Sequence, residues 1–175
     1  MRPNIRALCA SAVIGALYAV LTLALSPISY GPVQLRLSEC LCLLPFFFPG
    51  SVWGLFLGCA LANIMTGNIF DVVFGSLATL LAGLVTAWAG RLRLCFGSRL
   101  LGCTAPVVIN ALMVGAVICG AYNGLHPLAH PEVFALYALQ IAAGEALVMY
   151  LIALPLSYYL PGKRFFQEFI REVNK

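Results

Sequence analysis

Residues Ser29–Glu39 read SYGPVQLRLSE and interrupt a chain that is otherwise strongly apolar. The segment holds a Gly-Pro turn, and Arg36 and Glu39 lie three residues apart within it. A bilayer penalises charged side chains, so a membrane-embedded protein that keeps such a pair between its spans is expected to use it. Arg36 and Glu39 are therefore candidate site residues. The alternative is that Arg36 pairs with Glu39 and merely holds the loop.

The composition of the chain predicts a membrane protein. Its 175 residues are 62% hydrophobic and 9% charged, whereas typical proteins carry about 25% charged residues. We therefore expect a single transmembrane domain over residues 1–175. The apolar run Ala7–Leu25 is longer than the apolar core of a signal peptide and is interpreted as a retained first span.

The apolar segments predict an all-α membrane protein, a compact bundle of six transmembrane helices. A helical span needs about 20 apolar residues. The second and third segments are shorter, and Leu37–Pro49 reaches only about 20 Å at about 1.5 Å per residue. Residues 37–66 are therefore either two short spans or one re-entrant hairpin. The predicted spans are Ala7–Leu25, Leu37–Pro49, Ser51–Thr66, Asp71–Ala89, Thr104–Tyr122 and Val133–Leu160.

The positions of lysine and arginine predict the orientation. With six spans, every basic residue except Arg36 falls on the side of the two termini. Positive residues favour the cytoplasmic side, so both termini are predicted to be cytoplasmic, with tails over residues 1–6 and 162–175. The basic residues on that side are Arg2, Arg6, Arg91, Arg93, Arg99, Lys163, Arg164, Arg171 and Lys175.

Polar side chains concentrate in the outward half of the predicted spans. Asn110 lies twelve residues before Tyr122, and Glu145 lies twelve after Val133. Both are therefore about 18 Å below the outer ends of their helices, and antiparallel neighbours would hold them level. Nearer the outer ends are Arg36, Glu39, Asn63 and Asp71.

Glu145 is the strongest single indication of a functional site in the sequence. A carboxylate near the middle of a bilayer is disfavoured by about 2.5–3.5 kcal/mol, and no lysine or arginine lies in predicted spans four to six. Three explanations stay open: a structural hydrogen bond with Asn110, a proton-coupling role, or recognition of a ligand. A carboxylate accepts two parallel N–H bonds, and a guanine-like ring offers such an edge through its ring N–H and exocyclic amine.

Other features carry less information. Pro127 and Pro131 argue against a helix that would align His126 and His130 as metal ligands, so no metal is expected and the role of these histidines stays open. The seven cysteines are interpreted as small buried hydrophobic residues. No phosphate-binding loop, GxSxG or HExxH pattern occurs, so neither an enzyme nor a bound cofactor is predicted. Stacking against a ligand and an interfacial aromatic belt are alternative roles for Tyr30, Phe70, Phe74 and Tyr122.

Small residues recur at helix-face spacing and allow helix backbones to approach closely. In the third segment they are interpreted as packing inside the bundle. The first segment carries two adjacent rows, so one of them is a candidate contact with another subunit. The first row is Ser11, Gly15 and Ala19, with Ala12 and Ala16 beside it.

Five stretches together resemble successive segments of the QueT family, the substrate-binding (S) subunits of energy-coupling factor (ECF) transporters. They are ISYGPVQLRLSECLCLLPFF, GLFLGCALANI, DVVFGSLATLLAGLVT, PVVINALMVG and GEALVMYLIALPL. The resemblance implies a six-helix bundle in a bacterial plasma membrane that captures a queuosine precursor from outside. Such precursors are 7-deazaguanine bases, namely preQ0 (7-cyano-7-deazaguanine), preQ1 (7-aminomethyl-7-deazaguanine) and queuine.

The resemblance also implies partners and site residues. The partners are a membrane coupling subunit and two cytoplasmic ATPase subunits, and the coupling subunit is expected to meet Ser11, Ala12, Gly15, Ala16 and Ala19. The positions expected to serve the ligand are Arg36, Glu39, Asn63, Asp71, Asn110 and Glu145. Two alternatives stay open: an S subunit for another planar vitamin or base, and a proton-coupled secondary transporter that uses Glu145.

Overall fold

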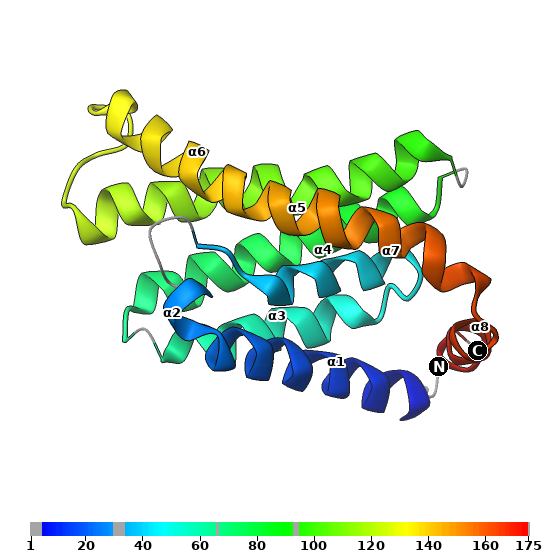
Figure 1. The fold of residues 1–175 in the computed structure, drawn as a ribbon. Coiled ribbons are helices and arrows are strands. Elements are labelled where there is room, and N and C mark those ends of the chain that lie inside the picture. The colour runs from blue at the N-terminus through cyan, green and yellow to red at the C-terminus, as the bar shows by residue number, and fades with distance from the viewer. Residues whose placement is uncertain (1–4, 30–33, 66, 93–94, 175) are drawn as a thin grey trace.

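The computed structural model describes residues 5–29, 34–65, 67–92 and 95–174, and these residues form helices and connectors without strands (Figure 1). The predicted all-α fold is thereby confirmed. The first elements are α1 Ile5–Ala24, α2 Ser26–Ser29, the 3-10 helix η1 Leu37–Phe46, α3 Ser51–Ile64, the π-helix η2 Asp71–Gly75 and α4 Ser76–Gly90. The later ones are α5 Phe96–Val117, the π-helix η3 Ile118–Tyr122, α6 Pro131–Val148, the π-helix η4 Met149–Ala153, α7 Leu154–Tyr159, the 3-10 helix η5 Leu160–Gly162 and α8 Arg164–Val173.

Four continuous helical stretches among the described residues are long and apolar enough to cross a membrane. The apolar helices η1 and α3 are shorter, as the sequence predicted. The fifth apolar helix begins at Phe96 instead of the predicted Thr104. The reason is a capping box: the Cys95 backbone N–H donates to the Ser98 hydroxyl, and this bond satisfies a backbone group at the helix start. The long stretches are Ile5–Ala24, Asp71–Gly90, Phe96–Tyr122 and Pro131–Gly162.

The short helix η1 lies at the centre of the bundle. It contacts α1, α3, α4, α5 and α6, and Figure 1 shows it running between α1 on one side and α6 on the other. In a 3-10 helix, side chains three residues apart lie on one line. Glu39, Cys42 and Pro45 therefore share a line, and all three are buried.

The helices α1 and α3 pack at backbone contact distance. A Cβ atom added at Gly15 would collide with the carbonyl oxygen of Gly54, and one added at Gly58 would collide with that of Gly15. Ser11 joins the same contact: its hydroxyl accepts from the Gly54 N–H at 3.0 Å and donates to the Gly50 carbonyl at 2.9 Å. The predicted packing role of the small residues in the third segment is confirmed.

The C-terminal segment forms an amphipathic helix that the sequence analysis did not predict. α8 lies end-on in Figure 1, beside both termini, and packs on the end of the bundle. Its apolar residues recur at helical spacing, which favours a helix with one buried face. Arg6 at the start of α1 forms an ion pair with Glu172, and Asn174 donates to the Phe47 carbonyl at 3.0 Å. The apolar residues of this face are Phe166, Phe169, Ile170 and Val173.

Candidate functional site

A buried polar cluster lies around η1, the central helix that contacts α1, α5 and α6. We call it the central polar cluster; it consists of Tyr18, Arg36, Glu39, Cys42, Asn110 and Glu145. Each of these side chains is buried. The cluster includes four of the six residues that the sequence predicted to serve a ligand. The structure therefore brings together positions that are more than a hundred residues apart in the chain.

Both carboxylate oxygens of Glu39 have donors from within the chain. The Tyr18 hydroxyl donates to Oε1, and the Cys42 thiol donates to Oε2 at 2.9 Å. The second bond follows from the 3-10 geometry of η1, which aligns residues three apart. An ionised carboxylate has about four acceptor positions, so Glu39 is oriented by these two bonds and still has capacity to accept others.

The prediction that Asn110 and Glu145 lie at the same level on neighbouring helices is confirmed. The Asn110 side-chain amide donates to Glu145 Oε1 at 2.9 Å, and the bond joins α5 to α6. Glu145 is 3% exposed, and among the described residues its Oε2 atom has no hydrogen-bond partner. An unmade hydrogen bond of a buried carboxylate is costly. This oxygen is therefore the strongest sign of a missing partner in the cluster.

Charges from other elements act on Glu145. The Glu39 carboxylate repels its charge and the Arg36 guanidinium attracts it. Arg36 is itself buried, and its Nε–H donates to the Ser29 carbonyl at 3.4 Å. Spans four to six contain no lysine or arginine, and the guanidinium that acts on Glu145 comes instead from the segment before η1.

Asn63 and Asp71 form a separate group nearer the end of α3. The Asn63 amide donates to the backbone carbonyl of Asp71 at 3.0 Å and to the Cys59 sulfur at 3.4 Å. The Asp71 carboxylate accepts from the Tyr122 hydroxyl. This bond ties η2 to η3 and engages Asp71 away from Glu145.

An apolar cavity of about 700 Å³ lies beside this second group. Its walls are Phe70 and Phe74 together with six residues of α5 and η3, namely Leu112, Met113, Ala116, Val117, Gly120 and Ala121. The two phenylalanine rings are stacked, with centroids 6.3 Å apart and an angle of 9° between their planes. The volume falls within the range of small-molecule sites, and stacking of the two rings against a ligand stays a prediction. Tyr30, from the same prediction, lies outside the described residues.

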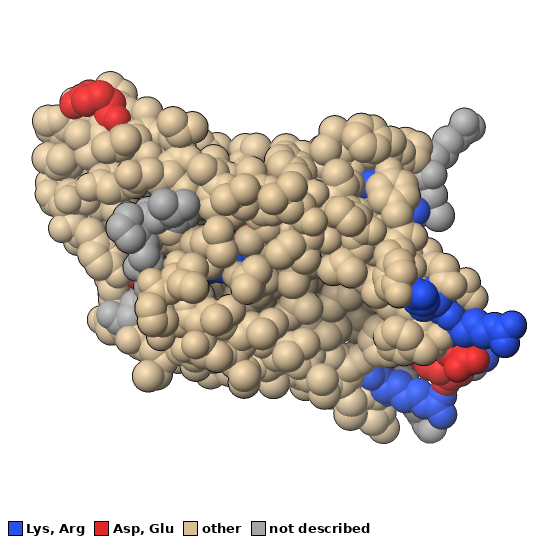
Figure 2. Space-filling view, in the orientation of Figure 1, with Lys and Arg blue, Asp and Glu red and all other residues tan. Residues whose placement is uncertain are grey.

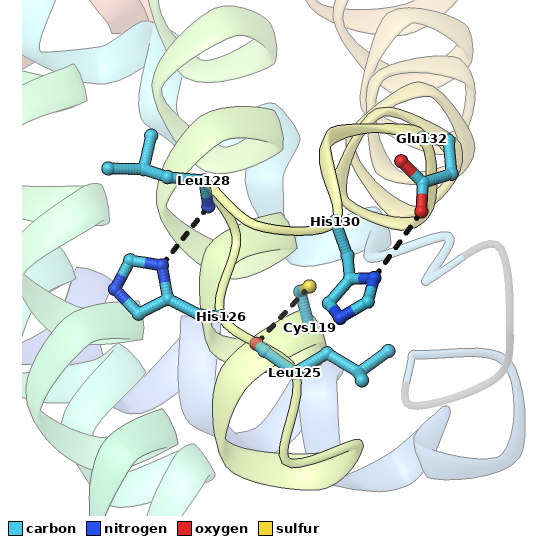
Figure 3. Close-up of polar contacts among 6 residues, drawn as sticks. All are labelled: Cys119, Leu125, His126, Leu128, His130 and Glu132. Atoms are coloured by element: carbon cyan, nitrogen blue, oxygen red, sulfur yellow. Dashed lines mark hydrogen bonds and ion pairs between the residues drawn. The ribbon is translucent and has the colours of Figure 1, made fainter.

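The histidines of the connector between η3 and α6 have separate local contacts (Figure 3). His126 Nδ1 accepts from the Leu128 N–H at 3.3 Å. His130 Nδ1 lies 3.5 Å from Glu132 Oε1 at the start of α6. Within the described residues no group of three or more His, Cys, Asp or Glu side chains is placed to hold a metal ion.

The two small-residue rows of α1 have different surroundings. Ser11, Gly15 and Ala19 are buried, and the first two lie in the contact with α3 described above. Ala12 and Ala16 are exposed on the surface of α1. The buried row already packs within this chain. Ala12 and Ala16 are therefore the members of the predicted partner set that another subunit can reach.

Tyr18 and Cys42 were missed as site residues. The signal for Tyr18 was present in the sequence, because a tyrosine in the middle of an apolar span needs a partner for its hydroxyl. Cys42 is buried as predicted, whereas the same prediction is wrong for Cys9 and Cys95, which are exposed. The Cys42 thiol also serves as a hydrogen-bond donor. No sequence signal distinguished Cys42 from the other cysteines.

The sequence profile of a family described as QueT transporter matches residues 8–161 of the chain. A similar curated protein is the queuosine precursor transporter QueT of Lactococcus lactis subsp. cremoris (strain MG1363), which is 41% identical over 71 residues. That alignment covers 39% of this chain and 42% of the relative, so it spans less than half of either protein. No solved structure gives a significant match.

Proposed function

This chain belongs to the QueT transporter family, and from that membership we propose that it is the substrate-capture (S) subunit of an ECF importer. The proposed substrate is a queuosine precursor, a 7-deazaguanine base taken from outside the cell. A relative that is 41% identical over part of its length carries the name queuosine precursor transporter. The family is one of transporters, and we assign this chain the step of substrate binding.

The observation that carries the proposal is the Oε2 atom of Glu145, which has no hydrogen-bond partner within the part of the chain that the structure describes. A ring N–H together with an exocyclic amine supplies the donors that a buried carboxylate requires. Asn110 holds the other oxygen of Glu145, so the carboxylate keeps one orientation before a ligand arrives. Pre-organisation of this kind reduces the entropy lost on binding.

The other site residues extend this recognition. Glu39 is oriented by Tyr18 and Cys42 and offers further acceptor positions to the base. Phe70 and Phe74 provide aromatic surface near Asp71. The proposed substrate-binding set remains Arg36, Glu39, Asn63, Asp71, Asn110 and Glu145.

The charge distribution supports the proposed orientation in a bacterial plasma membrane. Figure 2 shows basic side chains gathered at the end of the bundle that carries the termini in Figure 1. Positive residues favour the cytoplasmic side, so we assign both termini to the cytoplasm. With η1 and α3 counted as short spans, the bundle has six.

Energy for transport comes from partners in this proposal. The membrane coupling subunit docks on the exposed Ala12 and Ala16 face of α1, because small side chains allow a second helix to approach closely. Two cytoplasmic ATPase subunits complete the importer.

Calorimetry on the purified chain in nanodiscs tests the proposal. We expect preQ0, preQ1 or queuine to bind, and Glu145→Gln to weaken binding by about 1.5–3 kcal/mol, the value of a hydrogen bond to a charged group. Glu132→Gln is the matched control, since Glu132 is an exposed carboxylate at the start of the same helix and its loss should leave affinity unchanged. If none of the three bases binds, the proposed function is wrong.

The Oε2 atom of Glu145, which has no hydrogen-bond partner among the described residues, also favours one alternative, a proton-coupled secondary transporter. An uptake assay with liposomes that contain only this chain distinguishes an S subunit from a secondary transporter. Uptake of the base that is driven by a pH gradient and abolished by Glu145→Gln would favour proton coupling. Competition with a panel of other planar bases and pterins tests whether the substrate is a different vitamin.

A further inference from the structure

A groove between α3 and α4 contains both tryptophans of the chain. It has a volume of about 240 Å³, and its lining includes Trp53, Trp88 and, just after the end of α4, Arg91. The two tryptophan side chains are largely exposed, which is typical of the membrane–water interface. We propose that this tryptophan groove binds an anionic phospholipid, with the headgroup phosphate on Arg91 and the acyl chains along α3 and α4.

The spacing of the lining residues explains why a groove forms. Those of α4 recur at intervals of three and four residues, so they share one face of the helix. Val52 and Ala87 are small and buried, whereas the tryptophans are large and exposed. Small buried side chains between large exposed ones leave a hollow. The lining includes Val52 and Trp53 at the start of α3, and Leu84, Ala87, Trp88 and Arg91 at the end of α4.

Arg91 is available to a ligand. Other basic residues are engaged: the Arg99 guanidinium lies 4.3 Å from the centre of the Tyr158 ring, and the Lys163 ammonium lies 4.2 Å from that of Tyr159. Within the described part of the chain, the exposed Arg91 side chain has no hydrogen bond or ion pair. A guanidinium binds a phosphate through two parallel N–H bonds, so Arg91 suits a headgroup phosphate.

The size of the groove and its surroundings indicate a lipid. Its volume is below the roughly 300–1,000 Å³ of sites for small molecules, so it fits one part of a longer molecule. Exposed leucines continue the two helix faces away from the groove, Leu57 and Leu61 on α3 and Leu81 and Leu77 on α4. Leu77 lies eleven residues before Trp88, which is about 16 Å along the helix. This length matches one leaflet of the roughly 30 Å hydrocarbon core.

Charge complementarity selects an anionic lipid. The end of α4 lies at the same end of the bundle as the C-terminus, because Gly90 packs against the Phe46 carbonyl and Asn174 donates to that of Phe47. Figure 2 shows basic side chains gathered at this end. The proposed orientation places it at the cytoplasmic leaflet, whose headgroups carry net negative charge. The groove therefore offers an anionic headgroup a positive partner and its chains an apolar path.

Tryptophan fluorescence tests the proposal, because both tryptophans of the chain lie in the groove. The chain is reconstituted in equal mixtures of phosphatidylglycerol and phosphatidylcholine, with bromine, a quencher of tryptophan, on the acyl chains of one lipid at a time. From the quenching we expect an association constant for phosphatidylglycerol about fivefold that for phosphatidylcholine, and a ratio near one in Arg91→Gln. Arg164→Gln is the matched control, since Arg164 is exposed on α8 outside the groove and its loss should keep the wild-type ratio.

The wild-type ratio alone decides the proposal, so a failure of Arg91→Gln to fold does not leave it untested. A wild-type ratio near one overturns it, and if Trp53→Ala then weakens co-purification with the coupling subunit, the groove is a protein contact instead. An equal fall of the ratio in Arg91→Gln and Arg164→Gln would show attraction by the whole basic surface and would also overturn it. The experiment contains no deazaguanine base, so its outcome is independent of the proposed function.

Discussion

Tyr18 of α1 donates its hydroxyl hydrogen to Oε1 of Glu39 in η1, and neither side chain is more than 1% exposed. The bond joins the first helix to the central helix of the bundle. One turn further along α1, the Thr22 hydroxyl lies 2.6 Å from that of Ser38. The first pair orients a proposed ligand-binding carboxylate, whereas the second joins the same two helices without touching the carboxylate.

Removal of the Tyr18 hydroxyl should weaken ligand binding through Glu39. Tyr18→Phe keeps the ring and leaves a buried carboxylate oxygen without its donor, which costs about 1–3 kcal/mol. We expect a lower unfolding temperature and a weaker affinity for the base, measured by thermal unfolding and calorimetry. Thr22→Val is the matched control: it should lower stability but leave affinity unchanged.

A double-mutant cycle distinguishes positioning from a general structural effect. If Tyr18 acts through Glu39, Tyr18→Phe should cost affinity in the wild type and very little in a Glu39→Gln background, because coupled residues are not additive. Equal losses in both backgrounds would show that Tyr18 does not position Glu39.

Gly54 should be intolerant of any side chain. A Cβ at this position would collide with the backbone carbonyl of Ser11, and overpacking of this kind costs about 1–3 kcal/mol or more. We expect Gly54→Ala to lower the unfolding temperature sharply. Gly162→Ala is the control, since nothing lies within 4 Å of its added Cβ. Similar unfolding temperatures for the two variants would contradict the close contact between α1 and α3.

Larger side chains on the exposed face of α1 should block docking of the coupling subunit and leave ligand binding unchanged. Ala12→Leu and Ala16→Leu are expected to weaken co-purification with a coupling subunit, because overpacking a close helix contact costs about 1–3 kcal/mol. Calorimetry should show unchanged affinity for the base. Ala135→Leu, an exposed alanine on α6, is the control. An effect of Ala135→Leu as large as that of the α1 variants would place the docking face elsewhere.

Cys95 should report the orientation of the chain. It is exposed in the connector before α5, and hydrogen bonds with Ser98 lower the pKa of its thiol. A lowered pKa raises the thiolate fraction at neutral pH and speeds alkylation. We expect a membrane-impermeant maleimide to label Cys95 in inside-out vesicles and not in intact cells, with Cys95→Ser as the control. Labelling of intact cells at Cys95 would reverse the proposed orientation.

Much of the candidate site was predictable because it depends on local geometry. The rise per residue in a helix placed Asn110 and Glu145 at one depth, and the structure joins them by a hydrogen bond. Asp71 was predicted to serve the same ligand from a position nearer the outer end of its helix, and in the structure its carboxylate accepts from the Tyr122 hydroxyl. Depth is a property of one helix, whereas a contact depends on the rotation of two helices about their axes.

The sequence alone determined that this chain is an all-helical membrane protein with acidic residues at depth, because hydropathy and helical rise are properties of consecutive residues. Only the tertiary structure decided that η1 is central, that Tyr18 orients Glu39, and that Arg36 acts on Glu145 from another segment. The same holds for α1, where burial against α3 left Ala12 and Ala16 exposed. Hydrogen bonds and charge interactions act through space between distant segments, so they are fixed only when the helices pack.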